Sequence, residues 1–410
     1  MDYYTDYFNT TALSLSPDDE QYEEKLLAIA SHFRSFSDAL SQFIGEHGYD
    51  GSDSAETKAA FIKLKFSEAG IPTPRDIKNW FSGTKTIKRD TAFQICFAFS
   101  LDVNGTNAFF RKVYLERSFD CHTISEAVYY YCIRNGISYN EALEIIDKMP
   151  KVKKGPINTK QEILYTGSII SFINGVKSAD ELIAYVTDHI EQFGYNNATA
   201  TKHIQELWNA ISCQSGIAFK EGQLRDNAFN QYREGDAGSA DNYTVVTEEA
   251  DSIWKVYAQI FGLDKYQTVK YGTNRTIKPL LENNQLLPPL AEASFPDRDG
   301  IEKITSGVHV SHERIRKLMI LLEFYVFWAN VIIQNNSALA VSAEHDAERC
   351  IDKINTYLLE AGYPELYPGN PYDWIFMWAV KDQRPLLAFR DHMIALYAYK
   401  SDQLAKKETE

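Results

Sequence analysis

Four polar side chains between residues 73 and 83 could contact phosphates or the edges of bases. Arg75, Lys78, Asn79 and Ser82 repeat at spacings of three and four, which places them on one face of a helix. Guanidinium, ammonium, amide and hydroxyl groups are donors that suit phosphate oxygens and base edges. The solvated face of an ordinary surface helix has the same composition, so this stretch alone leaves both interpretations open.

The local sequence predicts a helix over residues 73–83 that would position these donors. Thr73 can act as the N-cap and Pro74 suits the first helical position, where no backbone N–H is needed. Gly83 is typical of a residue that ends a helix. The opposite side of this helix carries an apolar stripe formed by Ile77, Trp80 and Phe81.

Basic residues are concentrated around this stretch, although the chain as a whole is acidic. Residues 56–117 contain eleven Lys and Arg against six Asp and Glu, a net charge of +5 within a chain of net charge −14. This segregation favours a local anion-binding patch and excludes a protein that coats nucleic acid along its whole length. Lys85, Lys88 and Arg89 follow the predicted helix and are expected to bind a phosphate backbone.

The order of the predicted helices resembles the five-helix DNA-binding domain of the Cro/phage-repressor (XRE-like) helix-turn-helix family. Five helices are expected at 33–47, 55–69, 73–82, 89–100 and 105–114, and Ile77, Trp80 and Gly83 match the apolar and glycine positions of the family's third helix. The resemblance implies a bacterial or phage-like DNA-binding protein that reads paired half-sites as a homodimer. It also implies that Arg75, Lys78 and Asn79 face the major groove and that Lys85 and Lys88 contact phosphates.

The whole chain is predicted to be all-α, with two domains. Residues 1–150 would form the helix-turn-helix domain with a preceding helix and a following helical hairpin, whose helices begin at the capping boxes Thr123–Glu126 and Ser138–Glu141. A lysine-rich linker follows Met149. Residues 160–410 would form a larger helical interaction or sensor domain with long loops near 221–246 and 264–309. The most hydrophobic helix, 312–334, contains Glu323 and is expected to be a core helix rather than a membrane span.

Signals for an enzyme, a metal or a cofactor are weak. The pair Arg117 and His122 has the spacing of a helical ribonuclease motif, but no third group supports it. His309, His312, Glu313 and His345 form no recognisable zinc motif, and we expect no metal and no cofactor. The five cysteines contain no CxxC pair, which indicates reduced thiols and a cytoplasmic location.

These observations lead to one main hypothesis and two alternatives. The main hypothesis is a non-enzymatic, sequence-specific DNA-binding transcriptional regulator, whose C-terminal domain binds a protein partner or a small ligand or peptide. The first alternative is a helical scaffold or accessory protein that uses its N-terminal domain for protein docking. The second is an RNA-directed nuclease or effector that uses Arg117 and His122.

Overall fold

Helices make up all the regular secondary structure in the part of the chain that the computed structural model describes, so the all-α prediction is confirmed. No strand occurs among these residues. The structure describes residues 15–30, 33, 35–82, 87–116, 118–151, 166–193, 198–235, 253–262, 298–306, 308, 310, 312–361, 363, 365–393 and 396.

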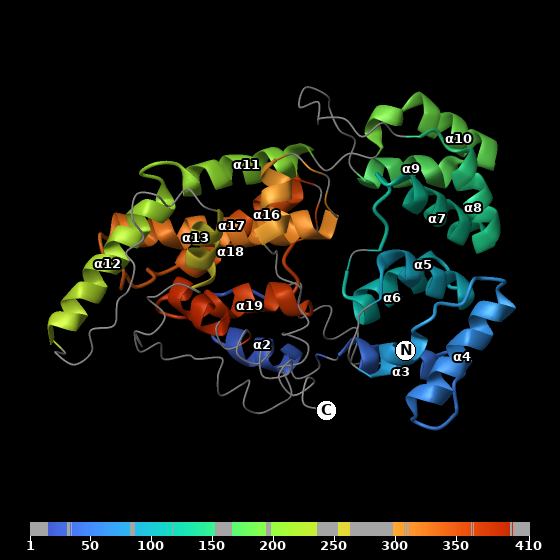
Figure 1. Cartoon of the computed structure of the whole chain (residues 1–410), viewed down its shortest axis with the longest axis horizontal. Coiled ribbons are helices and arrows are strands. Elements are labelled where there is room, and N and C mark those ends of the chain that lie inside the picture. The colour runs from blue at the N-terminus through green and yellow to red at the C-terminus, as the bar shows by residue number, and fades with distance from the viewer. Residues whose placement is uncertain are drawn as a thin grey trace. The chain divides into compact units, whose positions relative to one another are not determined.

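The contacts divide the chain into two units, and the sequence of one unit interrupts the sequence of the other (Figure 1). The split unit consists of Met1–Phe33 and Thr199–Glu410, and the inserted unit is Arg34–Ala198. This division differs from the predicted one of 1–150 and 160–410. The difference arises because the first helix packs with the C-terminal helices, whereas residues 166–193 pack with the hairpin.

The inserted unit is built from short helices around one apolar core. Helix α3 carries Phe36, Leu40, Phe43 and Ile44 at helical spacing, and all four side chains are buried. The helical elements of this unit are α3 (Phe36–Glu46), α4 (Ala55–Glu68), η1 (Ile77–Phe81), α5 (Arg89–Ala98), α6 (Val103–Phe109), η2 (Phe110–Tyr114), α7 (Ile124–Asn135), α8 (Tyr139–Lys148), α9 (Thr166–Gly175), α10 (Ala179–Asp188) and η3 (Ile190–Gln192).

The split unit is organised around α17 (His312–Gln334), which is buried along most of its length. It packs against α12 (Ile217–Gly235) and α18 (Asp346–Glu360), and α19 (Pro371–Ala379) packs against α2 (Tyr22–Ala30), as Figure 1 shows. The unit also contains α11 (Ala198–Ser212), α13 (Ile253–Phe261) and α16 (Arg298–Thr305), and a further helix covers 385–393.

Helix α17 is the one helix among the described residues that is long and apolar enough to cross a membrane. However, 67% of its apolar window is buried inside the unit. Its two buried charges also have partners there: Arg316 donates to both oxygens of Asp373 at 2.9 and 2.7 Å, and His203 lies 2.6 Å from Glu323. This arrangement is that of a core helix.

The predicted helix at 73–83 is much shorter in the structure. Residues 71–74 have no regular structure, and η1 is a single 3₁₀ segment over Ile77–Phe81 with Asp76 at its N-cap. The prediction that Thr73 caps this helix is therefore wrong. Pro72 and Pro74 disfavour helical conformation in the residues before them, Ile71 and Thr73, which accounts for the late start of the helix. Gly83 lies outside the described residues.

Two predicted loops are partly helical. The loop expected at 221–246 begins inside α12, and the irregular span expected at 264–309 contains α16. The polar composition of residues 221–235 suggested a loop, but Glu221 and Arg225 are buried at successive turns of α12. They form an ion pair with each other, and Glu221 also pairs with Arg390, which is far away in the sequence. Residues 236–252 and 263–297 lie outside the described part.

The hairpin at 124–148 forms as predicted, but only one of its two capping boxes does. The Ser138 hydroxyl accepts from the backbone N–H of Glu141, and the Glu141 carboxylate accepts from the N–H of Ser138 at 3.0 Å. Thr123 makes no side-chain capping bond to α7, and Glu126 turns inward to Arg89. The Glu126 carboxylate is bound to Arg89 in a buried ion pair, so it does not form the capping-box bond to the backbone N–H of Thr123.

This difference predicts unequal effects of two matched substitutions. Ser138→Ala should lower the free energy of unfolding of the inserted unit by about 1 kcal/mol, because it removes an N-cap bond. Thr123→Ala should cost less than about 0.5 kcal/mol, because no cap bond is lost. Urea denaturation followed by circular dichroism measures both changes, and equal costs would contradict the assignment of the caps.

Candidate nucleic-acid interface

The element η1 presents a polar side to solvent because its apolar side is held in the core. Ile77 and Trp80 are 0% and 5% exposed, and η1 packs against α3 and α4. Arg75, Lys78 and Ser82 are exposed and Asn79 is half-buried. Four of the predicted site residues therefore lie within one short segment.

Two of these four side chains have partners within the inserted unit. The ammonium of Lys78 forms an ion pair with Glu56 on α4, which lowers the pKa of the Glu56 carboxyl mainly through the Lys78 hydrogen bond. Both side chains are 63% exposed, so salt screens this pair and the ammonium can exchange partners at little cost. The Ser82 hydroxyl donates to the backbone oxygen of Asn79 at 3.0 Å.

The three basic residues expected to bind phosphates after η1 have different environments. Lys88 is exposed at the N-cap of α5. Lys85 lies outside the described residues. Arg89 points inward, where its Nε and Nη2 atoms donate to the two carboxylate oxygens of Glu126 at 2.6 and 2.7 Å.

Further contacts fix the Arg89 guanidinium in this position. It donates to the backbone oxygen of Ser118 and lies 3.4 Å from Glu116. Its flat face covers the rings of Phe93 and Phe110 at 5.5 and 5.2 Å. Because all these contacts are internal, we leave Arg89 out of the proposed interface and assign it to the stability of the inserted unit.

The sequence assigned Glu126 to the capping box of α7, but in the structure it binds Arg89 instead. Its side chain is 9% exposed, and it also accepts from the backbone N–H of Asp120 at 2.7 Å. Burial raises the pKa of the Glu126 carboxyl, while the hydrogen bond from Arg89 pulls it back down. No local pattern joins Arg89 to Glu126, because 37 residues separate them.

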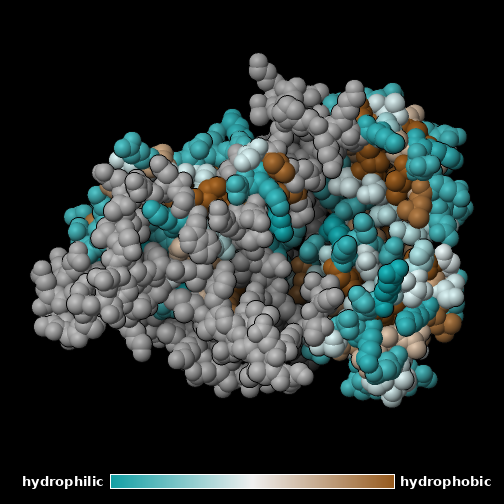
Figure 2. Space-filling view, in the orientation of Figure 1, coloured by the Kyte–Doolittle hydropathy of each residue, from teal (hydrophilic) through white to brown (hydrophobic). Residues whose placement is uncertain are grey.

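Other exposed basic residues in the same unit were counted in the sequence but not assigned to a site. Arg111 and Lys112 lie on η2, a π-helical turn that packs against α3, and both are exposed. Lys63 is exposed on α4, and in Figure 2 the surface over that helix is mostly hydrophilic. Their positive charge adds to the potential of the unit without a specific geometry.

The weaker catalytic signals gain no support from the geometry. The ring Nδ1 of His122 lies 2.9 Å from the backbone oxygen of Gln192, and Arg117 lies outside the described residues. His309 is also outside this part, as is the side chain of His312.

In the split unit, one histidine is oriented by a buried carboxylate. His203 contacts Glu323 at 2.6 Å and stacks on Tyr357 with ring centres 3.8 Å apart, and Lys353 lies 3.3 Å from the other oxygen of Glu323. These contacts neutralise the acidic residue in α17 and explain how that helix carries a carboxylate that is 1% exposed.

Comparison of the chain with protein-family models, with curated proteins and with solved structures found no match.

Proposed function

We propose that the inserted unit binds duplex DNA in a sequence-specific manner and that the chain is a cytoplasmic transcriptional regulator. The observation that carries the proposal is the exposure of Lys78 on η1 and of Arg75 in the turn just before it, while the apolar side of η1 is fixed in the core directly after α4. Arg75 would read a base edge, Lys78 and Lys88 would bind phosphates, and Asn79 and Ser82 would contribute neutral hydrogen bonds. Lys85, which follows Ser82 in the sequence, would bind phosphate as well.

The split unit would supply the regulatory input. Its net charge is −13, since the chain carries −14 overall and the inserted unit, residues 34–198, carries 19 Lys and Arg against 20 Asp and Glu. It would therefore stay away from the DNA and bind a protein partner, a small ligand or a peptide, or form the homodimer that paired half-sites require.

The second candidate function is protein docking by the same surface. The Lys78–Glu56 ion pair favours it, because this pair lowers the positive charge that the face of η1 offers to DNA. The length of η1 also favours it, since five residues of 3₁₀ helix reach less far into a groove than a longer helix.

A DNA selection experiment separates the two functions. The full chain is incubated with a fluorescent duplex library at two salt concentrations, alongside Arg75→Ala, Lys78→Ala and Lys202→Ala. Arg75→Ala should weaken binding to the selected sequence by about 1–3 kcal/mol, and Lys78→Ala should reduce the salt slope by about one. Lys202 is exposed on α11 in the split unit, so its removal is the charge-matched control and should change neither value.

Glu56→Gln gives an independent test, because it releases Lys78 and removes a negative charge from the same face. It should raise the affinity for DNA and steepen the salt dependence. If no sequence is enriched and binding does not depend on salt, the DNA proposal fails and protein docking remains.

A further inference from the structure

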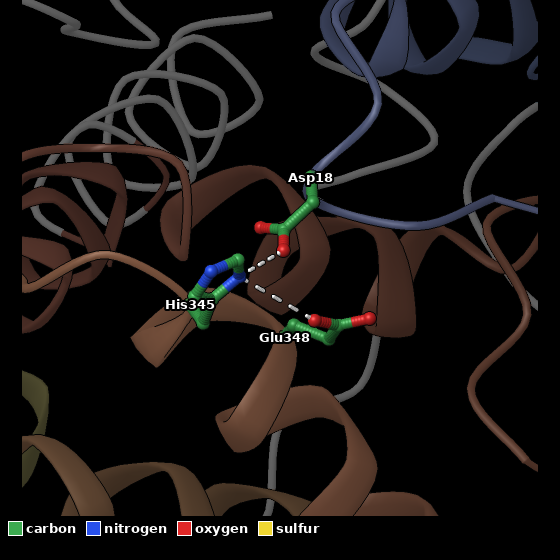
Figure 3. A group of neighbouring side chains, drawn as sticks. All are labelled: Asp18, His345 and Glu348. Carbon is green, nitrogen blue, oxygen red and sulfur yellow. Dashed lines mark hydrogen bonds and ion pairs between the residues drawn. The ribbon is translucent and has the colours of Figure 1, made fainter.

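Three potential metal ligands from distant parts of the sequence meet on the split unit. The carboxylates of Asp18 and Glu348 both point toward the imidazole of His345 (Figure 3). The Asp18 Oδ2 atom lies 2.5 Å from His345 Nδ1, and the Glu348 Oε2 atom lies 3.8 Å from the same nitrogen. One donor atom from each residue lies within 4.8 Å of the other two.

Two separate backbone elements place the three residues next to one another. His345 is the N-cap residue of α18 and Glu348 lies three residues later, so both occupy one face at the start of that helix. Asp18 lies in the turn before α2, and the adjacent Pro17 carbonyl accepts from Lys381 Nζ at 2.6 Å. The three residues are therefore adjacent before any ion binds, so less chain has to be ordered on binding.

Two carboxylates face each other in this cluster and require a positive charge between them. The hydrogen bond to His345 lowers the pKa of Asp18, whereas the contact with Asp18 raises the pKa of Glu348. The hydrogen bond to Asp18 also raises the pKa of His345. Glu344 lies on the opposite side of the imidazole, 3.7 Å from Nε2 of His345. Two other charged groups act on the carboxylates: Lys381 on Asp18 and Asp352 on Glu348.

We propose that Asp18, His345 and Glu348 bind a divalent transition-metal ion that joins the segment before α2 to the start of α18. One imidazole nitrogen and two carboxylate oxygens are ligands that Zn²⁺ accepts, and water completes the coordination at this exposed position. The imidazole selects against Mg²⁺ and Ca²⁺, which prefer oxygen ligands alone. A metal ligand must be deprotonated, so the ion competes with protons for the imidazole of His345 and binding strengthens as the pH rises.

Isothermal titration of the metal-free full chain with Zn²⁺ tests this site. The expected result is one saturable site whose affinity falls about tenfold or more in His345→Ala and in Glu348→Gln, since even the loss of an outer-shell partner costs a metal site 10- to 100-fold. Titration in two buffers with different ionisation enthalpies should show proton release. Saturating Zn²⁺ should raise the melting temperature of the split unit, whereas Mg²⁺ at the same concentration should raise it far less.

Glu344→Gln is the matched control, because it removes an exposed carboxylate next to His345 on the side away from the cluster. It should leave the Zn²⁺ affinity within about twofold of the unchanged chain, as expected for a charge outside the coordination sphere. His189→Ala controls for binding to other histidines, since His189 is half-buried and lies in the inserted unit. An affinity that survives both His345→Ala and Glu348→Gln, or a chain that binds no Zn²⁺ at millimolar concentration, overturns the proposal.

Discussion

Replacing Glu221 with glutamine is expected to lower the free energy of unfolding of the split unit by about 3–5 kcal/mol, the usual cost of breaking a buried ion pair. Glu221 is 0% exposed and accepts from Nη1 and Nη2 of Arg390 at 2.9 and 3.2 Å. Arg225 lies 3.7 Å away on the same helix, and Tyr325 donates to the carboxylate at 3.3 Å. Without the carboxylate, the guanidinium of Arg390 stays buried while the charge that compensates it is lost.

Guanidinium chloride denaturation followed by tryptophan fluorescence measures this effect, since five of the six tryptophans belong to the split unit. Glu206→Gln is the control: Glu206 forms an ion pair with Lys202 at 3.8 Å, but both side chains are more than 60% exposed. Its removal should cost less than about 1 kcal/mol. Equal costs for the two variants would show that the buried network contributes no more than a surface pair.

The same residue predicts how the stability of the split unit depends on pH. Burial alone would raise the pKa of Glu221, but Arg390 and Arg225 outweigh it and lower the pKa from 4.5 to about 2. Because the pKa is lower in the folded state, the stabilisation is complete above about pH 4.5 and is lost as the pH falls toward 2. At about 1.4 kcal/mol per pKa unit this amounts to roughly 3 kcal/mol. Glu221→Gln should remove that part of the acid sensitivity, which denaturation at pH 3 and pH 6 would reveal.

The sequence predicted those helices whose start and end signals are local. Ser138 and Glu141 form the expected capping box, and the apolar residues of α3 and α17 are buried as their spacing indicated. The sequence did not predict α12, because its polar residues resemble those of a loop. Arg390, the buried partner of Glu221, is 169 residues away in the sequence. Local patterns contain no information about such a partner.

The candidate sites show the same limit. The exposure of Lys78 followed from the apolar spacing of Ile77 and Trp80, which fixes the orientation of η1. By contrast, 37 residues separate Arg89 from Glu126. Asp18 and His345 are separated by 327 residues, and only folding brings them together. A basic or acidic residue can therefore be recognised in the sequence, but its partner comes from the tertiary structure.

Removing residues 1–33 is expected to destabilise the split unit as strongly as the loss of Glu221. Helix α2 buries Tyr22, Leu26, Ile29 and Ala30, and each large side chain contributes about 1.5–3 kcal/mol of burial. The Tyr22 hydroxyl donates to the backbone oxygen of Met377 at 2.9 Å, and Trp374 Nε1 donates to that of Leu26 at 2.9 Å. Without α2, the buried indole N–H of Trp374 loses its hydrogen-bond acceptor.

For a chain that begins at Arg34, the split unit should therefore unfold at a lower denaturant concentration. A synthetic peptide of residues 15–33 added in excess should restore the original midpoint, because a ligand that binds the folded state stabilises it by mass action. In the full chain, Leu26→Ala should cost about 2–5 kcal/mol because Leu26 is 0% exposed. Glu24→Ala, an exposed position on the same helix, should stay within about 0.5 kcal/mol. If the shortened chain keeps its midpoint, or if the peptide does not change that midpoint, then α2 is not part of the core of the split unit. The division of the chain into a split unit and an inserted unit of residues 34–198 would then be wrong.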